Sequence, residues 1–282
     1  MKRTIAFIIA LCLGAGLVVN AQVNEKIEVY EKDQIKDKKP VPYKPVREAD
    51  VIWSKTIWRI VDLRQKMNMP LYYPTQPIGN RMSLIDLLLY GVTNEGLNVY
   101  DANSPDATTE FDIQMTPEQV DRAMDALPDT VQVQNEDGTY REEIVPGSAK
   151  TYQVKQIMVK EKWYFDKQHS IMEVRIIGMC PIRLYYKEDN PQLLKEMAFW
   201  VYYPEARPLL ANHEIYNRHN DAQRISFDDF FLQRRFDSYV LAESNVYNNR
   251  WITSYALGEK ALLESNRVEH FLFRMEHDMW VY

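Results

Sequence analysis

The sequence predicts an α+β fold: a central antiparallel β-sheet with flanking helices, preceded by an extended N-terminal arm. Three observations predict it. Strand-like segments are concentrated in the middle of the 282-residue chain, helical segments lie before and after them, and a charged stretch with three prolines stands near the N-terminus. The order helices, strands, helices favours an α+β protein with an antiparallel sheet.

Residues 1–21 have the features of a secretory signal peptide. Two basic residues precede the apolar run Ile5–Val19, and small residues end at Ala21, as signal peptidase requires. The alternative, a membrane anchor, needs an apolar span of about 20 residues, and this run is shorter. Cys12 lies inside the run, whereas a lipoprotein signal needs a cysteine directly after the cleavage site. We therefore expect export of a chain that starts at Gln22.

Residues 22–45 are predicted to form an extended arm. The segment is rich in charge, poor in large apolar residues and closes with Pro40, Pro42 and Pro45, so it cannot bury enough surface to fold alone. Two interpretations fit equally: a free tail, or a tether that lies along a neighbouring molecule. The rest of the chain, residues 46–282, is expected to form a single α+β domain.

The stretch from Arg47 to Met67 is predicted to be an amphipathic helix that ends before Pro70. At about 100° per residue, most of its apolar side chains share one face, whereas Val51 and Trp58 point to the opposite side. The shared face comprises Ala49, Ile52, Trp53, Ile57, Ile60, Leu63 and Met67.

Four further helices are predicted. One covers residues 83–90, and another begins at Thr116 with proline at its first helical position. The segment 226–240 begins with an N-cap serine, and the final helix covers about 257–278. One face of the final helix carries Leu257, Ala261, Val268, Phe271, Leu272 and Met275, whereas Leu262, Phe273 and Trp280 lie roughly 150° away.

The strands are expected between these helices. Residues 152–166 and 170–186 are β-rich runs whose short connection indicates a hairpin, and residues 196–208 supply a further strand. Before them, Asp137-Gly138 indicates a turn followed by a polar linker.

Composition argues against several functional classes. The formal charge is −6, and removal of Lys2 and Arg3 with the signal takes it to −8. This balance and the lack of a basic cluster do not favour nucleic-acid binding. Only 9 glycines occur, and none stands in a dinucleotide-binding or P-loop pattern. No cofactor is expected.

No metal or catalytic site is predicted. His213, His219 and Asp221 fit no standard ligand spacing, which favours a surface loop over a metal site. The acidic stretch from Asp101 resembles a calcium loop, but Pro105 stands where an oxygen ligand belongs. The remaining histidines, His169, His270 and His277, form no zincin-type pair.

Two other features have structural interpretations. Adjacent side chains on a helix diverge, so Asp228 and Asp229 are expected to serve the first turn of their helix. Cys180 is the only thiol after the signal, and its apolar surroundings predict a buried, inert side chain.

Four stretches together resemble the GldN/PorN family. They are "READVIWSKTIWRIVDLRQKMNMPLYYP", "KWYFDKQHSIMEVRIIGMCPI", "FWVYYPEARPLLANHEIYNRHNDAQRISFDDFF" and "SYVLAESNVYNNR". The resemblance implies a non-catalytic, periplasmic component of the type IX secretion and gliding machinery of Bacteroidetes. It further implies a ring of copies of the protein under the outer membrane with a GldK/PorK lipoprotein, and contact with the GldM/PorM shaft protein. Membrane attachment would then come only through the lipoprotein.

The two-sided helices indicate where a partner would bind. A helix with apolar residues on two faces is either sandwiched within its own domain or in contact with another subunit. We name Val51, Trp58, Leu262, Phe273 and Trp280 as candidate interface residues, since aromatic side chains dominate binding hot spots. The alternative function is an exported ligand-binding or hydrolytic domain that uses the acidic loops or histidines.

Overall fold

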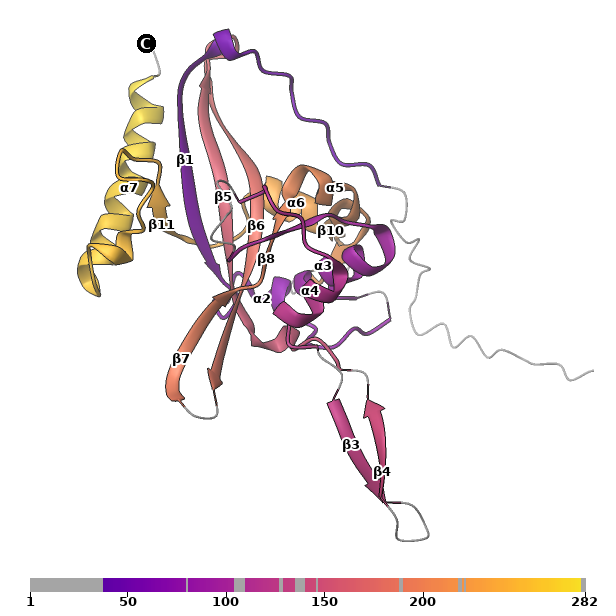
Figure 1. Ribbon diagram of the computed structural model, residues 1–282. Helices are drawn as coiled ribbons and strands as arrows, with labels where there is room; N and C mark the ends of the chain where they lie inside the picture. The colour runs from indigo at the N-terminus through magenta and orange to yellow at the C-terminus, as the bar shows by residue number, and fades with distance from the viewer. Residues whose placement is uncertain are drawn as a thin grey trace, which may run out of the picture. The chain divides into compact units, whose positions relative to one another are not determined.

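A computed structural model describes residues 38–79, 81–103, 110–126, 129–134, 140–145, 147–187, 190–217, 220 and 222–279. All of them lie in one compact unit, Ile35–Tyr282. An antiparallel sheet combines with helices in this unit (Figure 1), so the predicted α+β class is confirmed. The predicted signal peptide and the arm before Lys38 lie outside the described residues.

The strands are β1 Val51–Asp62, β2 Val99–Asp101, β3 Asp129–Gln134, β4 Tyr140–Val145, β5 Val154–Asp166, β6 Ile171–Lys187, β7 Asn190–Met197, β8 Phe199–Tyr202, β9 Glu214–Ile215, β10 Ile225–Ser226 and β11 Tyr239–Glu243. The α-helices are α2 Met69–Tyr72, α3 Leu84–Tyr90, α4 Pro117–Ala123, α5 Tyr203–Asn212, α6 Phe227–Leu232 and α7 Glu259–Asp278. Short 3-10 or π-helical turns are η1 Glu48–Asp50, η2 Gly91–Glu95, η3 Thr151–Gln153 and η4 Ile252–Ser254.

The main sheet has seven strands in the order β11-β1-β5-β6-β8-β2, with β7 also paired to β6. Its pairings are antiparallel. The long hairpin β5–β6 forms its centre, and Asp166 lies opposite Ile171 at the turn. The hairpin predicted from the sequence is therefore confirmed.

The predicted helix from Arg47 to Met67 is wrong: residues Val51–Asp62 form strand β1, between β5 and β11. The segment is rich in β-branched and aromatic residues, which favour strands. Its C-terminal half is buried on both faces of the sheet, so it reads as a nearly continuous apolar run. Such a run also matches a helical period, and periodicity alone does not separate the two.

The two faces of β1 contribute to different parts of the core. Side chains alternate along a strand: Ile57 packs under α7 with Val240, Val268 and Leu272. Trp58 instead belongs to a cluster on the other face. A third and larger cluster lies between the sheet and helices α3, α5 and α6. Figure 1 shows α7 (yellow) beside β11 and β1 at the left of the view, and helices α3, α5 and α6 to the right of the long strands.

The remaining predicted helices are found with adjusted ends. Ser83 caps α3, Thr116 caps α4 in a capping box, and Ser226 caps α6. The segment 226–240 is helical only to Leu232, because its last residues enter β11. The predicted strand 196–208 divides into the end of β7, the short strand β8 and helix α5. The predicted Asp137-Gly138 turn lies outside the described residues, between the paired strands β3 and β4.

Candidate functional site: the arm-docking cluster

The cluster is built on the first turn of α6. Ser226 accepts a hydrogen bond from the backbone N–H of Asp229 at 3.2 Å, and the Asp229 side chain returns the contact in a capping box. This geometry points Asp229 outward and leaves Asp228 facing the interior. The expectation that both carboxylates serve the first turn is therefore met by Asp229, whereas Asp228 has another role.

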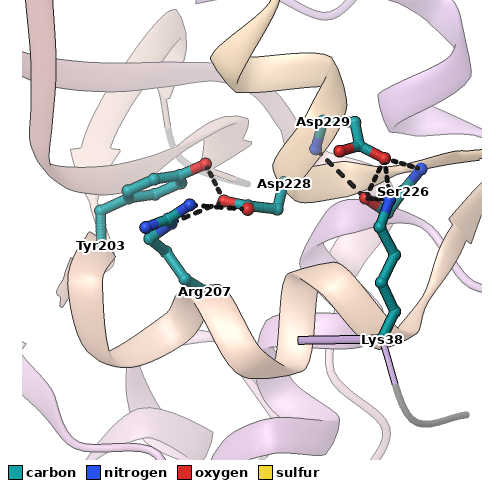
Figure 2. Close-up of polar contacts among 6 residues, drawn as sticks. All are labelled: Lys38, Tyr203, Arg207, Ser226, Asp228 and Asp229. Carbon is teal, nitrogen blue, oxygen red and sulfur yellow. Dashed lines mark hydrogen bonds and ion pairs between the residues drawn. The ribbon is translucent and has the colours of Figure 1, made fainter. Parts of the chain in front are cut away.

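Asp228 forms a buried ion pair with α5. The guanidinium of Arg207 donates two hydrogen bonds of 3.0 Å to its two carboxylate oxygens, and the Tyr203 hydroxyl donates a third at 2.9 Å (Figure 2). Burial would lower the pKa of Arg207, but Asp228 outweighs it and the pKa is raised. Burial and the same carboxylate raise the pKa of Tyr203. Bidentate geometry makes this one of the stronger kinds of side-chain contact, and it ties α5 to α6.

The described part of the N-terminal arm docks on this ion pair. The Val41 carbonyl accepts a hydrogen bond of 2.6 Å from Arg207, and the Tyr43 ring lies 4.1 Å from the same guanidinium. The guanidinium of Arg175 on β6 also lies over the Tyr43 ring, 5.0 Å from its centroid, and Arg175 donates to the Lys44 carbonyl. Burial raises the pKa of Tyr43. These contacts seat the arm between α5 and the edge of β6.

A second contact fixes the start of the described arm. The Lys38 ammonium forms an ion pair with Asp229 and lies 3.4 Å from the Ser226 hydroxyl (Figure 2). Burial would raise the pKa of Asp229, but the hydrogen bonds from Lys38 and Ser226 lower it. The arm thus follows its own domain, an arrangement outside the two sequence-based interpretations. We call residues Tyr203, Arg207, Ser226, Asp228 and Asp229 the arm-docking site.

The chemistry of this site suits binding rather than catalysis. Both oxygens of Asp228 are occupied by Arg207 and Tyr203, so the carboxylate is not free to act as a general base. Two groups of the site remain available to bind a chain: the face of the Arg207 guanidinium and the carboxylate of Asp229. These groups bind a backbone carbonyl, an aromatic ring and an ammonium.

The candidate interface residues are placed very differently. Trp58 is only 8 % exposed, and its indole N–H donates a 3.0 Å hydrogen bond to Glu110, so its expected position on an outer helical face is wrong. Val51 is half-buried at the start of β1. Leu262 and Phe273 lie on α7 and are 56 % and 68 % exposed. Trp280 lies outside the described residues.

The buried thiol, the candidate metal ligands and the helix lengths complete the comparison with the sequence-based predictions. Cys180 is fully buried and burial raises the pKa of its thiol, as its apolar surroundings predict. The described residues contain no group of three or more metal-ligating side chains; His219, Asp221 and Pro105 fall outside them. No helix in the described part of the chain is long and apolar enough to cross a membrane.

An open cavity of about 760 Å³ lies between α3, α4 and the loop before β5. Leu89, Val92 and Val120 supply apolar walls, and Asp86 on α3 and Asp121 on α4 supply carboxylates. The Ser83 hydroxyl donates to the Asp86 carboxylate at 2.6 Å. None of the histidines in the described part of the chain lines this cavity.

Most of the chain matches a known protein family. A family model described as "Gliding motility associated protein GldN" matches residues 46–281, which is nearly the whole chain. The chain belongs to the GldN family. The resemblance noted in the sequence is thereby confirmed, and this GldN-family protein is a component of the gliding-motility and type IX secretion machinery. No curated protein matches the chain.

The sequence did not predict the long-range contacts of the arm-docking site. It indicated the Asp228-Asp229 pair and the N-cap serine, but Tyr43, Arg175 and Arg207 are far from them in the sequence. A weak signal was present, since an arm that carries Val41 and Tyr43 between prolines is not purely polar. Nothing in the sequence pairs those residues with the arginines of β6 and α5.

Proposed function

We propose that this protein is a non-catalytic structural subunit of the secretion and gliding machinery. It forms a periplasmic ring of its own copies at the inner face of the outer membrane, together with a GldK/PorK-like lipoprotein, and contacts a GldM/PorM-like shaft protein. Membership in the GldN family across residues 46–281 is the observation that carries this proposal. GldN is not a known enzyme family.

The N-terminal sequence supports the location. The signal-like residues 1–21 direct export, and no acylated cysteine is expected at the new N-terminus. The intact mass of the exported protein should therefore match a chain that starts at Gln22, with or without cyclisation of that glutamine. A retained signal, or the added mass of a diacylglyceryl group, would contradict a periplasmic subunit held to the membrane through its lipoprotein partner.

Helix α7 is the surface best suited to a partner. Its inner face buries Val268 and Leu272 against β1 and β11. The apolar side chains of Leu262 and Phe273 remain exposed on the same helix. Exposed aromatic and aliphatic anchors on ordered elements are typical of binding hot spots. We assign this outer face to contact with a partner within the ring.

Co-purification with the lipoprotein tests both the function and the surface. The wild-type subunit should elute with the lipoprotein as a large complex, whereas Phe273→Asp should lose most of that association without a lower melting temperature. Tyr186→Asp is the matched control, because Tyr186 is 69 % exposed on β6, away from α7. A wild-type protein that elutes alone would overturn the ring proposal. A Phe273→Asp variant that assembles normally would overturn only the assignment of α7.

The alternative, an exported ligand-binding or hydrolytic domain, draws on one observation. The cavity between α3 and α4 has a volume in the range of small-molecule sites, about 300–1,000 Å³. Its test is distinct: Thr93→Trp places a large ring at an exposed position in the wall of the cavity. If secretion is unaffected by this change, the cavity has no part in the function of the subunit, and loss of secretion with an unchanged melting temperature and normal assembly would favour the alternative.

A further inference from the structure

We propose that, in the assembled ring, the arm of one copy docks on the arm-docking site of the next copy, so that neighbouring subunits exchange residues Lys38–Lys44. The contacts are those that the structure shows within a single chain. This inference rests on the proposed function, because it requires copies of the protein side by side. It assigns the arm-docking site a partner: the same segment of a second copy.

The first argument is that the docking site does not depend on the arm. Arg207, Tyr203 and Asp228 satisfy one another through hydrogen bonds of 2.9–3.0 Å. Ser226 and Asp229 likewise hold each other in the capping box of α6. Removing one partner of a buried ion pair is what destabilises it strongly; departure of the arm leaves Arg207 and Asp228 paired, so the site remains folded. It is then open to an identical arm.

The second argument is that the arm is anchored along Lys38–Lys44, whereas the segment that joins it to β1 is mostly exposed. Its anchors are the Lys38 ammonium, the Val41 carbonyl, the Tyr43 ring and the Lys44 carbonyl. All four contact residues more than 130 positions away in the sequence. Between the arm and β1, residues 45–49 are exposed, except for half-buried Val46. A change of backbone torsions in this short connection redirects the whole arm.

The third argument concerns shape and energy. Pro40, Pro42 and Pro45 hold the arm extended, so it does not collapse when it leaves its site. Docking in a neighbour restores the same ion pair, hydrogen bonds and ring contacts. Exchange of an identical element is therefore a low-cost way to join subunits. The seven exchanged residues reach roughly 23 Å when fully extended, which suits a neighbour in direct contact.

Charge complementarity provides the sharpest test. Lys38→Glu places two acids together at the contact with Asp229, and Asp229→Lys places two lysines together there. Either variant alone should lose the arm contact, whether docking is within or between chains. When the two variants are co-expressed with the lipoprotein, each faulty arm meets a complementary site only on the other copy. Exchange therefore predicts that the mixture recovers the assembly that each variant loses alone.

The double variant Lys38→Glu/Asp229→Lys is the control, because it restores the pair in both arrangements and shows that the reversed charges are tolerated. Recovery in the double variant without recovery in the mixture would overturn the exchange. Wild-type assembly that persists in both single variants would overturn it as well. A wild-type protein that forms no complex would instead refute the proposed ring. The elution volume of the wild type alone detects that outcome, so the two failures are distinguishable.

Zero-length carbodiimide coupling gives an independent readout on the wild-type complex. The amine of Lys38 and the carboxylate of Asp229 are in direct contact, so they should couple. In a complex reassembled from equal amounts of ¹⁴N- and ¹⁵N-labelled subunits, exchange predicts that roughly half of the coupled peptides combine the two labels. Coupled peptides that carry only one label each, or no coupling between these residues, would overturn the proposal.

Discussion

The carboxylate of Glu161 is completely buried under α7 and accepts a hydrogen bond of 3.1 Å from Nε of Arg59. Arg234 donates to the other carboxylate oxygen at 2.8 Å, and the Trp163 indole donates at 3.0 Å. Arg59 also reaches Glu269 on α7 at 2.7 Å. One buried acid thus joins β1 and β5 to the loop after α6, and through Arg59 to the helix assigned to partner contact.

Glu161→Gln should lower the free energy of unfolding by about 3–5 kcal/mol, because it leaves two arginines without their buried counter-charge. Urea denaturation measures this loss. The matched control is Glu264→Gln, which removes an exposed pair with Arg267 on α7 and should cost less than about 1 kcal/mol. If the two substitutions lowered the free energy of unfolding equally, the buried network under α7 would contribute no more to stability than an exposed ion pair.

Trp58→Ala should destabilise the subunit by about 3–5 kcal/mol, because it empties a buried position between strands. Trp53 is half-buried against Phe271, with ring centroids 6.4 Å apart, and Trp53→Ala should cost about 1–2 kcal/mol. The order is the reverse of the one that a helix would give. Thermal melts of both variants compare them directly, and an early melt for Trp53→Ala alone would argue against strand β1.

Cys180→Ala should cost about 1 kcal/mol and leave assembly intact, since the thiol fills a small space in the core. Its burial raises the pKa of the thiol, so little thiolate forms near neutral pH. Labelling with a maleimide should therefore be slow in the folded protein and fast in urea. Rapid labelling under native conditions would contradict an inert thiol.

The arm contact should weaken in acid. The pKa of Asp229 is lowered in the folded protein, so its contribution to stability is complete above about pH 4, near the ordinary pKa of aspartate. That contribution disappears as the pH falls through the lower, folded pKa. The difference in unfolding free energy between wild type and Asp229→Asn should thus be constant above about pH 5 and shrink below pH 4. A difference that does not shrink at all as the pH falls far below the ordinary pKa of aspartate would separate Asp229 from the contact with Lys38.

The sequence predicted the elements whose signals are local. A strand pair with a short connection gave β5 and β6, and N-cap residues located the starts of α3, α4 and α6. These signals depend on neighbouring residues only. Strand β1 was mistaken for a helix because its C-terminal half is buried on both faces, which removes the alternation that marks a half-buried strand.

The candidate site shows the same division at the level of single residues. The exposure of Leu262 and Phe273 followed from helical periodicity once α7 was placed. The position of Trp58 was predicted incorrectly. The helical period was applied to a segment that forms a strand, and it placed this buried side chain on an outer face. The placement of Trp280 stays a prediction, since that residue lies outside the described part of the chain.

The sequence by itself determined the α+β class, the central hairpin, the capped helices, the burial of Cys180 and the family. Each depends on composition, on spacing within one element, or on long stretches of similar sequence. Only the tertiary structure decided that Tyr43 meets Arg207, and that Glu161 is shared by Arg59 and Arg234. The physical reason is that a buried charge must find its partner in space, and the chain brings such partners together from distances that no local pattern records.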